Sequence, residues 1–118
     1  MNKYTQVELY EKIKNNTDLN DIQKYINDVL SLRGFNNQTP QEKMLLLFEE
    51  VGELAKAIRK SNSNLSIDYS RIDNFDSVEN EIADVFIVLL SICNVMDISI
   101  FESFISKESK NIERIWKK

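Results

Sequence analysis

The stretch EIADVFIVLLSICNVM, residues 81–96, decides the fold class. Within its last fifteen residues the polar ones are Asp84, Ser91 and Asn94. A helix that is apolar on nearly all sides is typical of one enclosed by other helices or by a partner subunit. We therefore expect residues 81–96 to form the central helix of the fold, with the remaining elements packed around it.

The composition also favours helices. The chain has 118 residues, about the size of one domain, and 42% of them are apolar. Two glycines and one proline are too few turn residues for a β-sandwich or barrel. We expect an all-α, oligomeric bundle of four or five helices forming a single domain over 1–118, in which 1–20 is a peripheral N-terminal segment and 21–118 is the core.

Local signals place the helix ends. Thr39 and Glu42 have the spacing of a capping box, and Pro40 stands at the first helical position. Gly34 is a natural stop for the helix before it, and Asp76 or Ser77 can cap the central helix. The expected elements are helices over 5–14, 21–32, 39–60, 76–96 and 99–116, with a loop over 61–75.

The long helix over 39–60 has one apolar face. At 100° per residue, six apolar side chains lie within about 60° of Val51. They are Met44, Leu47, Phe48, Leu54, Ala55 and Ile58. We expect this face to point at the core.

Several residue types are missing, which narrows the chemistry. The sequence has no histidine and only one cysteine, Cys93. An intrachain disulfide, the usual zinc sites and Ser-His-Asp catalysis are therefore excluded. Hydrolytic chemistry would fall to carboxylates, lysines or a hard metal ion such as Mg²⁺.

Charge and hydropathy patterning restrict the partners and the location. The formal net charge of -4 argues against a stable nucleic-acid partner. The N-terminal ten residues are polar, and the longest apolar run, 85–90, is far too short to cross a membrane. We expect no membrane association and a cytoplasmic location.

Five carboxylates stand on the two long helices. Glu49, Glu50 and Glu53 lie on the first, and Glu81 and Asp84 on the central one. Carboxylates three residues apart share one side of a helix, so the two patches together would make a site for a hard cation. A solvated, ion-paired surface is the alternative for the first helix. This alternative suits Asp84 less well, because Asp84 stands in the apolar central helix and a buried carboxylate needs a metal or a cationic partner.

Glu49-Glu50-Val51-Gly52-Glu53-Leu54 and Glu81-Ile82-Ala83-Asp84-Val85 resemble the EExxE and ExxD pair of the MazG-like family of all-α nucleoside triphosphate pyrophosphohydrolases. The similarity extends from about 25 to 116. It implies hydrolysis of a (deoxy)nucleoside triphosphate to the monophosphate and pyrophosphate by water attack at the α-phosphorus. It also implies Mg²⁺, with Mn²⁺ as a substitute, held by Glu50, Glu53, Glu81 and Asp84, while Glu49 activates the water.

The final helix carries the complementary charge. Lys107, Lys110, Asn111 and Arg114 are spaced to share one narrow face, which could hold triphosphate oxygens. Their alternative role is the usual preference of basic residues for a helix C-terminus. Arg33 is a further candidate for substrate binding.

A homo-oligomer, dimer or tetramer, is expected because the central helix has apolar surface on all sides. Two other functions remain open. One is a dUTPase-like enzyme of the same fold. The other is a non-catalytic helical module for oligomerisation or metal binding. The preferred nucleotide and the number of metal ions are not fixed by the sequence.

Overall fold

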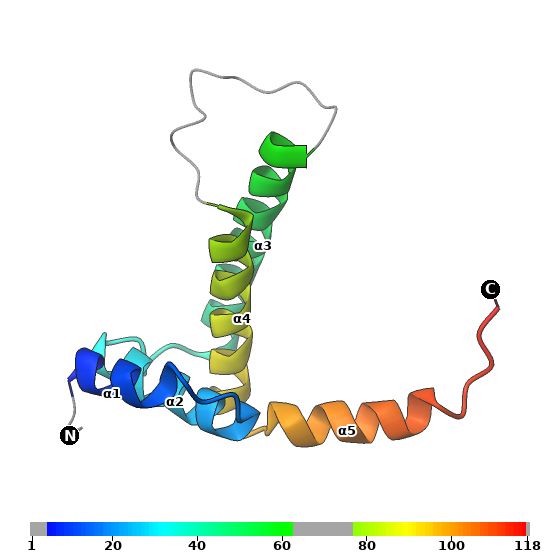
Figure 1. The fold of residues 1–118 in the computed structure, drawn as a ribbon, viewed down its shortest axis with the longest axis horizontal. Coiled ribbons are helices and arrows are strands. Elements are labelled where there is room, and N and C mark those ends of the chain that lie inside the picture. Colours follow the sequence, from blue (N-terminus) through cyan, green and yellow to red (C-terminus); the bar gives the residue numbers. More distant parts are fainter. Residues whose placement is uncertain (1–4, 63–76, 118) are drawn as a thin grey trace. The chain divides into compact units, whose positions relative to one another are not determined.

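The computed structural model describes residues 5–62 and 77–117, which form five α-helices and no strand (Figure 1). The predicted all-α fold is thus confirmed over these ranges. The helices are α1 (Gln6–Ile13), α2 (Leu19–Leu32), α3 (Pro40–Asn62), α4 (Val78–Val95) and α5 (Ile100–Asn111). They belong to two compact units, one made of Met1–Asn37 with Cys93–Lys118 and the other of Gln38–Ile92.

Residues that the sequence predicts as N-caps form hydrogen bonds at the starts of α3, α4 and α5. Thr39 and Glu42 form both hydrogen bonds of a capping box, from Glu42 N to Thr39 Oγ1 (3.1 Å) and from Thr39 N to Glu42 Oε1 (2.9 Å). Ser77 caps α4, since its Oγ accepts from Asn80 N at 3.2 Å, and the other candidate, Asp76, lies outside the described residues. Ser99 accepts from Glu102 N at 3.2 Å and starts α5. These bonds satisfy backbone groups that a helix cannot pair internally.

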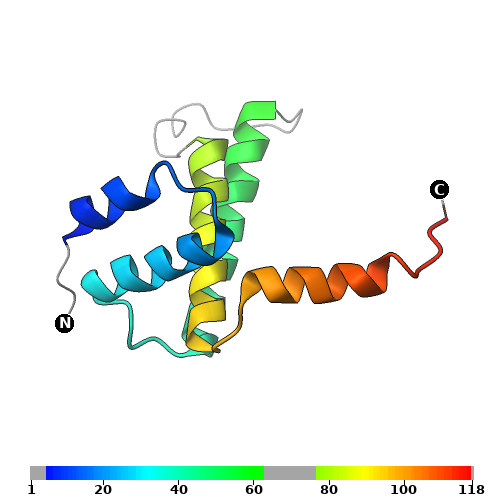
Figure 2. The same ribbon diagram turned by 60° about the horizontal axis from the view of Figure 1, so that its bottom comes forward.

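Within the first unit, α1 and α5 each contact α2 (Figure 2). The buried side of α2 carries Ile26 and Val29, each 2% exposed, and Leu9 of α1 is buried as well. These positions follow the apolar spacing expected for one buried face of α2. The segment 1–20 therefore contributes a buried side chain, while its assignment as a peripheral region stays a prediction.

Gln23 joins α2 to the end of α4, the start of α5 and the segment between them. Its Nε2 donates to Asn94 Oδ1 (2.9 Å) and to the carbonyl oxygen of Ile98 (2.8 Å). Its Oε1 accepts from Ile100 N (3.0 Å), and Asn94 Nδ2 donates to the carbonyl of Gln23 (3.1 Å). The amide of Gln23 is thus bonded at both ends, which offsets the cost of burying it.

Two helices end in the same left-handed turn. Gly34 (φ 84°) ends α2, and Phe35 N donates back to the carbonyl of Leu30 at 2.9 Å. Asp97 (φ 54°) ends α4, and Ile98 N donates to the carbonyl of Cys93 at 2.9 Å. Both are Schellman motifs, in which glycine is the favoured residue. The sequence indicates the first one through its glycine, but Asp97 gives no comparable signal.

In the second unit α3 and α4 lie side by side and antiparallel, as Figures 1 and 2 show. Most of the apolar face of α3 that we expected to point at the core is exposed instead, while its Leu47 and Leu54 are partly buried. Phe48 is 66% exposed and Val51 45%. The buried positions of α3 in the described chain are Lys43 (2%) and Ala57 (0%), on another side of the helix. The expectation was wrong because the sequence shows which face of a helix is apolar, but it does not show which element packs against that face.

Several helix ends differ from the expectation, including the start of α2, which begins at Leu19 and not at residue 21. Helix α3 continues to Asn62, two residues beyond the predicted end, and the rest of the predicted loop over 61–75 lies outside the described residues. The last helix does not reach Trp116, because α5 ends at Asn111. Ile112 and Ile115, which would have extended its apolar stripe, are 81% and 100% exposed. With no surface to pack against, nothing favours further helical turns.

Among the described residues, no single helix is long and apolar enough to cross a membrane. Helices α4 and α5 meet those criteria only when they are taken together across the break between them.

Replacing Gln23 by alanine should lower the free energy of unfolding by about 2–4 kcal/mol, because three hydrogen bonds are lost and buried partners are left unpaired. Urea denaturation followed by circular dichroism measures this change. Gln41→Ala, at an exposed position of α3, is the matched control and should change stability by less than about 0.5 kcal/mol. Equal effects of the two substitutions would contradict the role given to Gln23.

Candidate functional site

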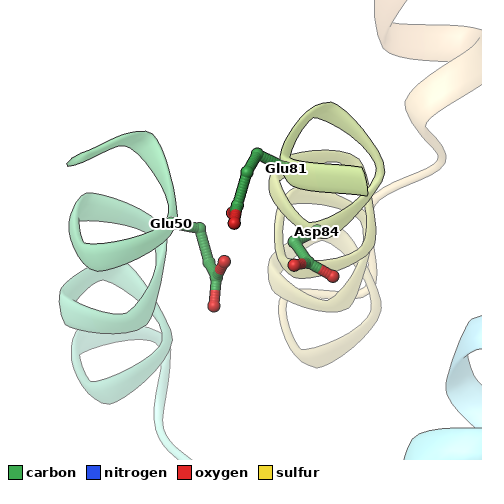
Figure 3. Close-up of side chains that lie close together, drawn as sticks. All are labelled: Glu50, Glu81 and Asp84. Atoms are coloured by element: carbon green, nitrogen blue, oxygen red, sulfur yellow. The ribbon is translucent and has the colours of Figure 1, made fainter. Parts of the chain in front are cut away.

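Three carboxylates from two helices converge in the second unit (Figure 3). Glu50 projects from α3, and Glu81 and Asp84 project from α4. Their nearest ligand oxygens all lie within 4.8 Å of one another. Glu81 is 6% exposed, and the other two are partly buried. The structure therefore brings together three of the four carboxylates that the sequence suggested as metal ligands.

The helix geometry explains how the cluster arises. Glu81 and Asp84 are three residues apart, so they lie on one side of α4, one turn from each other. Glu50 is seven residues before the buried Ala57 and therefore occupies the same side of α3. Because α3 and α4 lie side by side, these two sides carry their carboxylates into one place.

Negative charge accumulates at this cluster. Burial raises the pKa of Glu50 above its ordinary value of 4.5, and the charges of Asp84, Glu81, Glu53 and Glu49 raise it further. These like charges disfavour the ionised form of Glu50, and a bound cation would favour it. Carboxylate oxygens are the ligands that Mg²⁺ and Mn²⁺ prefer, so this donor set fits a hard divalent cation.

The remaining acidic candidates lie beside the cluster on α3. Glu53 is exposed, one turn beyond Glu50, and is not among the three converging groups. Glu49 precedes Glu50 and is exposed too. Both act on Glu50 through their charge. Their positions permit a role at the edge of the cluster that faces solvent.

The candidates for substrate binding belong to the other unit. Lys107 and Lys110 are exposed on α5. Asn111 is the last residue of α5, and its Nδ2 donates to Glu108 Oε1 at 2.9 Å. Arg114 lies beyond the helix, so it does not share the helical face that the sequence predicted for it. Its guanidinium carbon lies 4.8 Å from the ring centroid of Trp116.

Arg33 is the C-cap residue of α2, and its Nε donates to Gln6 Oε1 at 2.7 Å. This bond fixes the side chain against α1 and leaves the other guanidinium nitrogens for further partners. The residue as a whole is exposed.

Lys43 is a buried cation that the sequence analysis did not single out. It is 2% exposed, its Nζ donates to Gln38 Oε1 at 3.3 Å, and burial lowers its pKa. It lies seven residues before Glu50 and thus on the same side of α3. That seven-residue interval is the signal that the sequence offers, although lysine is rarely buried in proteins.

Glu50→Gln should make the metal-free protein more stable at neutral pH. Folding raises the pKa of Glu50 above its ordinary value of 4.5, so protonated Glu50 favours the folded state. This contribution to stability is complete below pH 4.5 and is lost as the pH rises through the pKa of Glu50 in the folded state. Thermal unfolding of metal-free protein between pH 4 and 8 measures this, and the variant should show a smaller decline with rising pH. Glu79→Gln, an exposed carboxylate on α4, should keep the wild-type profile. An unchanged profile for Glu50→Gln would contradict the assigned repulsion.

A divalent cation should stabilise the protein through the cluster. Mg²⁺ or Mn²⁺ at a hundredfold excess over its dissociation constant should add about 2.7 kcal/mol to the free energy of unfolding. Glu81→Gln should abolish most of this gain, whereas Glu79→Gln should retain it. Thermal shift or calorimetric titration measures the effect. Equal gains in the two variants would place the cation elsewhere.

Comparison with known proteins identifies the family. The family model for the MazG nucleotide pyrophosphohydrolase domain matches residues 38–116. This match covers more than half of the chain and includes all three converging carboxylates. Searches of curated proteins and of solved structures returned no significant match. On its matched length, its all-α fold and its paired acidic helices, the chain belongs to the MazG nucleotide pyrophosphohydrolase family.

Proposed function

We propose that this protein hydrolyses a (deoxy)nucleoside triphosphate to the nucleoside monophosphate and pyrophosphate in a reaction that requires Mg²⁺. The convergence of Glu50, Glu81 and Asp84 carries the proposal, because it supplies the hard-cation site that such a reaction needs. Membership of the family supplies the reaction class. Mn²⁺ is the expected substitute for Mg²⁺.

Glu50, Glu81 and Asp84 would bind the cation through their carboxylate oxygens. Glu53, one turn along α3 from Glu50, is the proposed fourth ligand. The bound cation supplies positive charge that offsets the negative charge of the phosphate oxygens during the reaction. The four carboxylates therefore bind and orient, and another group must handle the proton.

Glu49 is the proposed general base. It would accept a proton from the water that attacks the α-phosphorus. The new bond joins the water oxygen to that phosphorus, while the bond from phosphorus to the oxygen bridging the α- and β-phosphates breaks. The leaving pyrophosphate takes the electron pair of the broken bond. An exposed position beside the cluster is consistent with this role, because the attacking water must enter from solvent.

Basic and polar side chains of the other unit are proposed to bind the triphosphate. They are Lys107, Lys110, Asn111, Arg114 and Arg33. Charge supports this assignment, since Arg binds phosphate in a bidentate manner and Lys does so as a point charge. Arg114 stands outside the regular helix, so its approach to a phosphate would not be tied to the orientation of α5.

A homo-oligomer, dimer or tetramer, is part of the proposal. Helix α4 exposes Ile82 (53%) and Phe86 (39%) in the single chain, and α5 has no buried residue. Apolar surface of this extent favours association.

The test is release of pyrophosphate from a panel of nucleoside triphosphates with and without Mg²⁺. The panel includes the canonical NTPs and dNTPs, dUTP, dCTP and modified purine triphosphates. Turnover that requires the cation is expected for at least one of them, and selective turnover of dUTP would indicate the dUTPase-like alternative. If no triphosphate is hydrolysed at any practical enzyme concentration, the protein is a non-catalytic module.

Glu81→Gln should lower turnover by about a hundredfold or more, because cation stabilisation of phosphate charge is worth several kcal/mol. The helical circular dichroism signal should remain near that of the wild type. Glu79→Gln is the matched control and should retain activity. Collapse of the helical signal in Glu81→Gln would instead assign Glu81 a role in folding.

A further inference from the structure

The segment that follows α5 holds a stacked pair of side chains, Arg114 and Trp116. The guanidinium carbon of Arg114 lies 4.8 Å from the ring centroid of Trp116. This distance is within the range of about 6 Å over which the face of an indole attracts a cation. Arginine is well suited to such a contact because its guanidinium is planar and stacks on the ring. The ring of Trp116 therefore holds the charged end of Arg114 in one place.

The backbone of this segment keeps Arg114 close to the end of α5. Glu113 N donates to the carbonyl of Lys110 at 3.2 Å. Arg114 N donates to the carbonyl of Asn111 at 3.1 Å. Each bond joins residues three apart, so the chain makes a tight turn directly after the helix. The main chain thus fixes where the side chain of Arg114 begins, and the ring of Trp116 fixes where it ends.

The charge of Arg114 is not matched by a carboxylate. Among the described residues, no acidic group pairs with its guanidinium, which contacts the ring of Trp116. The ring takes up one face of the guanidinium, whereas the N–H groups point outward along its edge. Stacking therefore leaves this edge available for an anion. Phosphate oxygens accept from it in a bidentate manner.

The stacked pair is open to solvent. Trp116 is 62% exposed, and Arg114 is exposed as well. An exposed arginine has many rotamers, so its binding to an anion costs the free energy of ordering the side chain. A guanidinium that is already stacked on a ring has lost part of this freedom before the anion arrives. Preorganisation of this kind strengthens binding without adding a contact to the ligand.

We propose that Trp116 is a positioning residue for triphosphate binding. Its indole holds the guanidinium of Arg114 so that the N–H edge meets the phosphate oxygens of the ligand. Trp116 acts through Arg114 and does not itself contact the ligand. The role requires an aromatic face and not merely a large apolar side chain. This assignment rests on the proposed function, which includes Arg114 among the residues that bind the triphosphate.

Inorganic tripolyphosphate tests the pair, because it has the phosphate chain of the substrate and no nucleobase. Isothermal titration calorimetry of the full chain, with and without Mg²⁺, measures its dissociation constant. Trp116→Leu should weaken binding about three- to fivefold, as expected for loss of a cation–π contact at an exposed site. Trp116→Phe keeps an aromatic face and should stay within about twofold of the wild type. Ile115→Ala, at the fully exposed neighbouring position, is the matched control and should bind like the wild type.

A double-mutant cycle separates an indirect role of Trp116 from a direct one. Arg114→Gln alone should weaken tripolyphosphate binding about tenfold or more, because a charge-assisted contact is lost. Adding Trp116→Leu to Arg114→Gln should cause no further loss, since the ring then has no guanidinium to hold. A further loss as large as that of Trp116→Leu alone would mean that Trp116 contacts the ligand itself, which overturns the proposal.

Steady-state kinetics provides a readout that a change in folding alone would not give. For any nucleoside triphosphate that the wild type hydrolyses, Trp116→Leu should raise KM about three- to fivefold and leave kcat within about twofold. A fall in kcat at unchanged KM overturns the proposal, and so does a Trp116→Leu variant that binds tripolyphosphate as tightly as the wild type. If the wild type hydrolyses no triphosphate, the proposed function fails, but the tripolyphosphate titration still decides the role of Trp116. A wild type that does not bind tripolyphosphate overturns that role.

Discussion

Repulsion among the carboxylates held between α3 and α4 is the constraint on which the rest of the structure depends. Glu50, Glu81 and Asp84 are brought within reach of one another by the packing of two long helices, so their charge opposes the contact that positions them. A bound cation would remove that opposition. Cation binding at these carboxylates and packing of the helix pair would then strengthen each other.

The buried polar groups of the two units differ in how their hydrogen bonds and charges are balanced. In the first unit Gln23 is buried and bonded at both ends of its amide, which joins α2 to the start of α5 without excess charge. In the second unit three carboxylates, Glu50, Glu81 and Asp84, converge instead. A satisfied network fixes a structure, whereas a cluster of like charges stores free energy that binding can release. This contrast between the two units parallels the usual cost in stability of a functional site.

Local rules made much of this structure predictable. The capping box of Thr39 and Glu42, Ser77 before α4 and Gly34 after α2 depend on neighbouring residues only, and so do the i, i+3 carboxylates. The direction of the apolar face of α3 was not predictable, because it depends on which elements lie next to the helix. The early end of α5 was missed for the same reason, since Ile112 and Ile115 fit a helical stripe that has nothing to cover it. Burial of Lys43 and Gln23 likewise results from tertiary packing.

The division of the chain has a consequence for the order in which it folds. The unit of α1, α2 and α5 is discontinuous, because Gln38–Ile92 is inserted between its two parts. Gln23 can meet Asn94 and Ile98 only after seventy or more intervening residues have been closed into a loop. During synthesis the inserted helix pair is therefore complete before α2 obtains its C-terminal partners. Closure of the first unit therefore requires that α5 has already been synthesised.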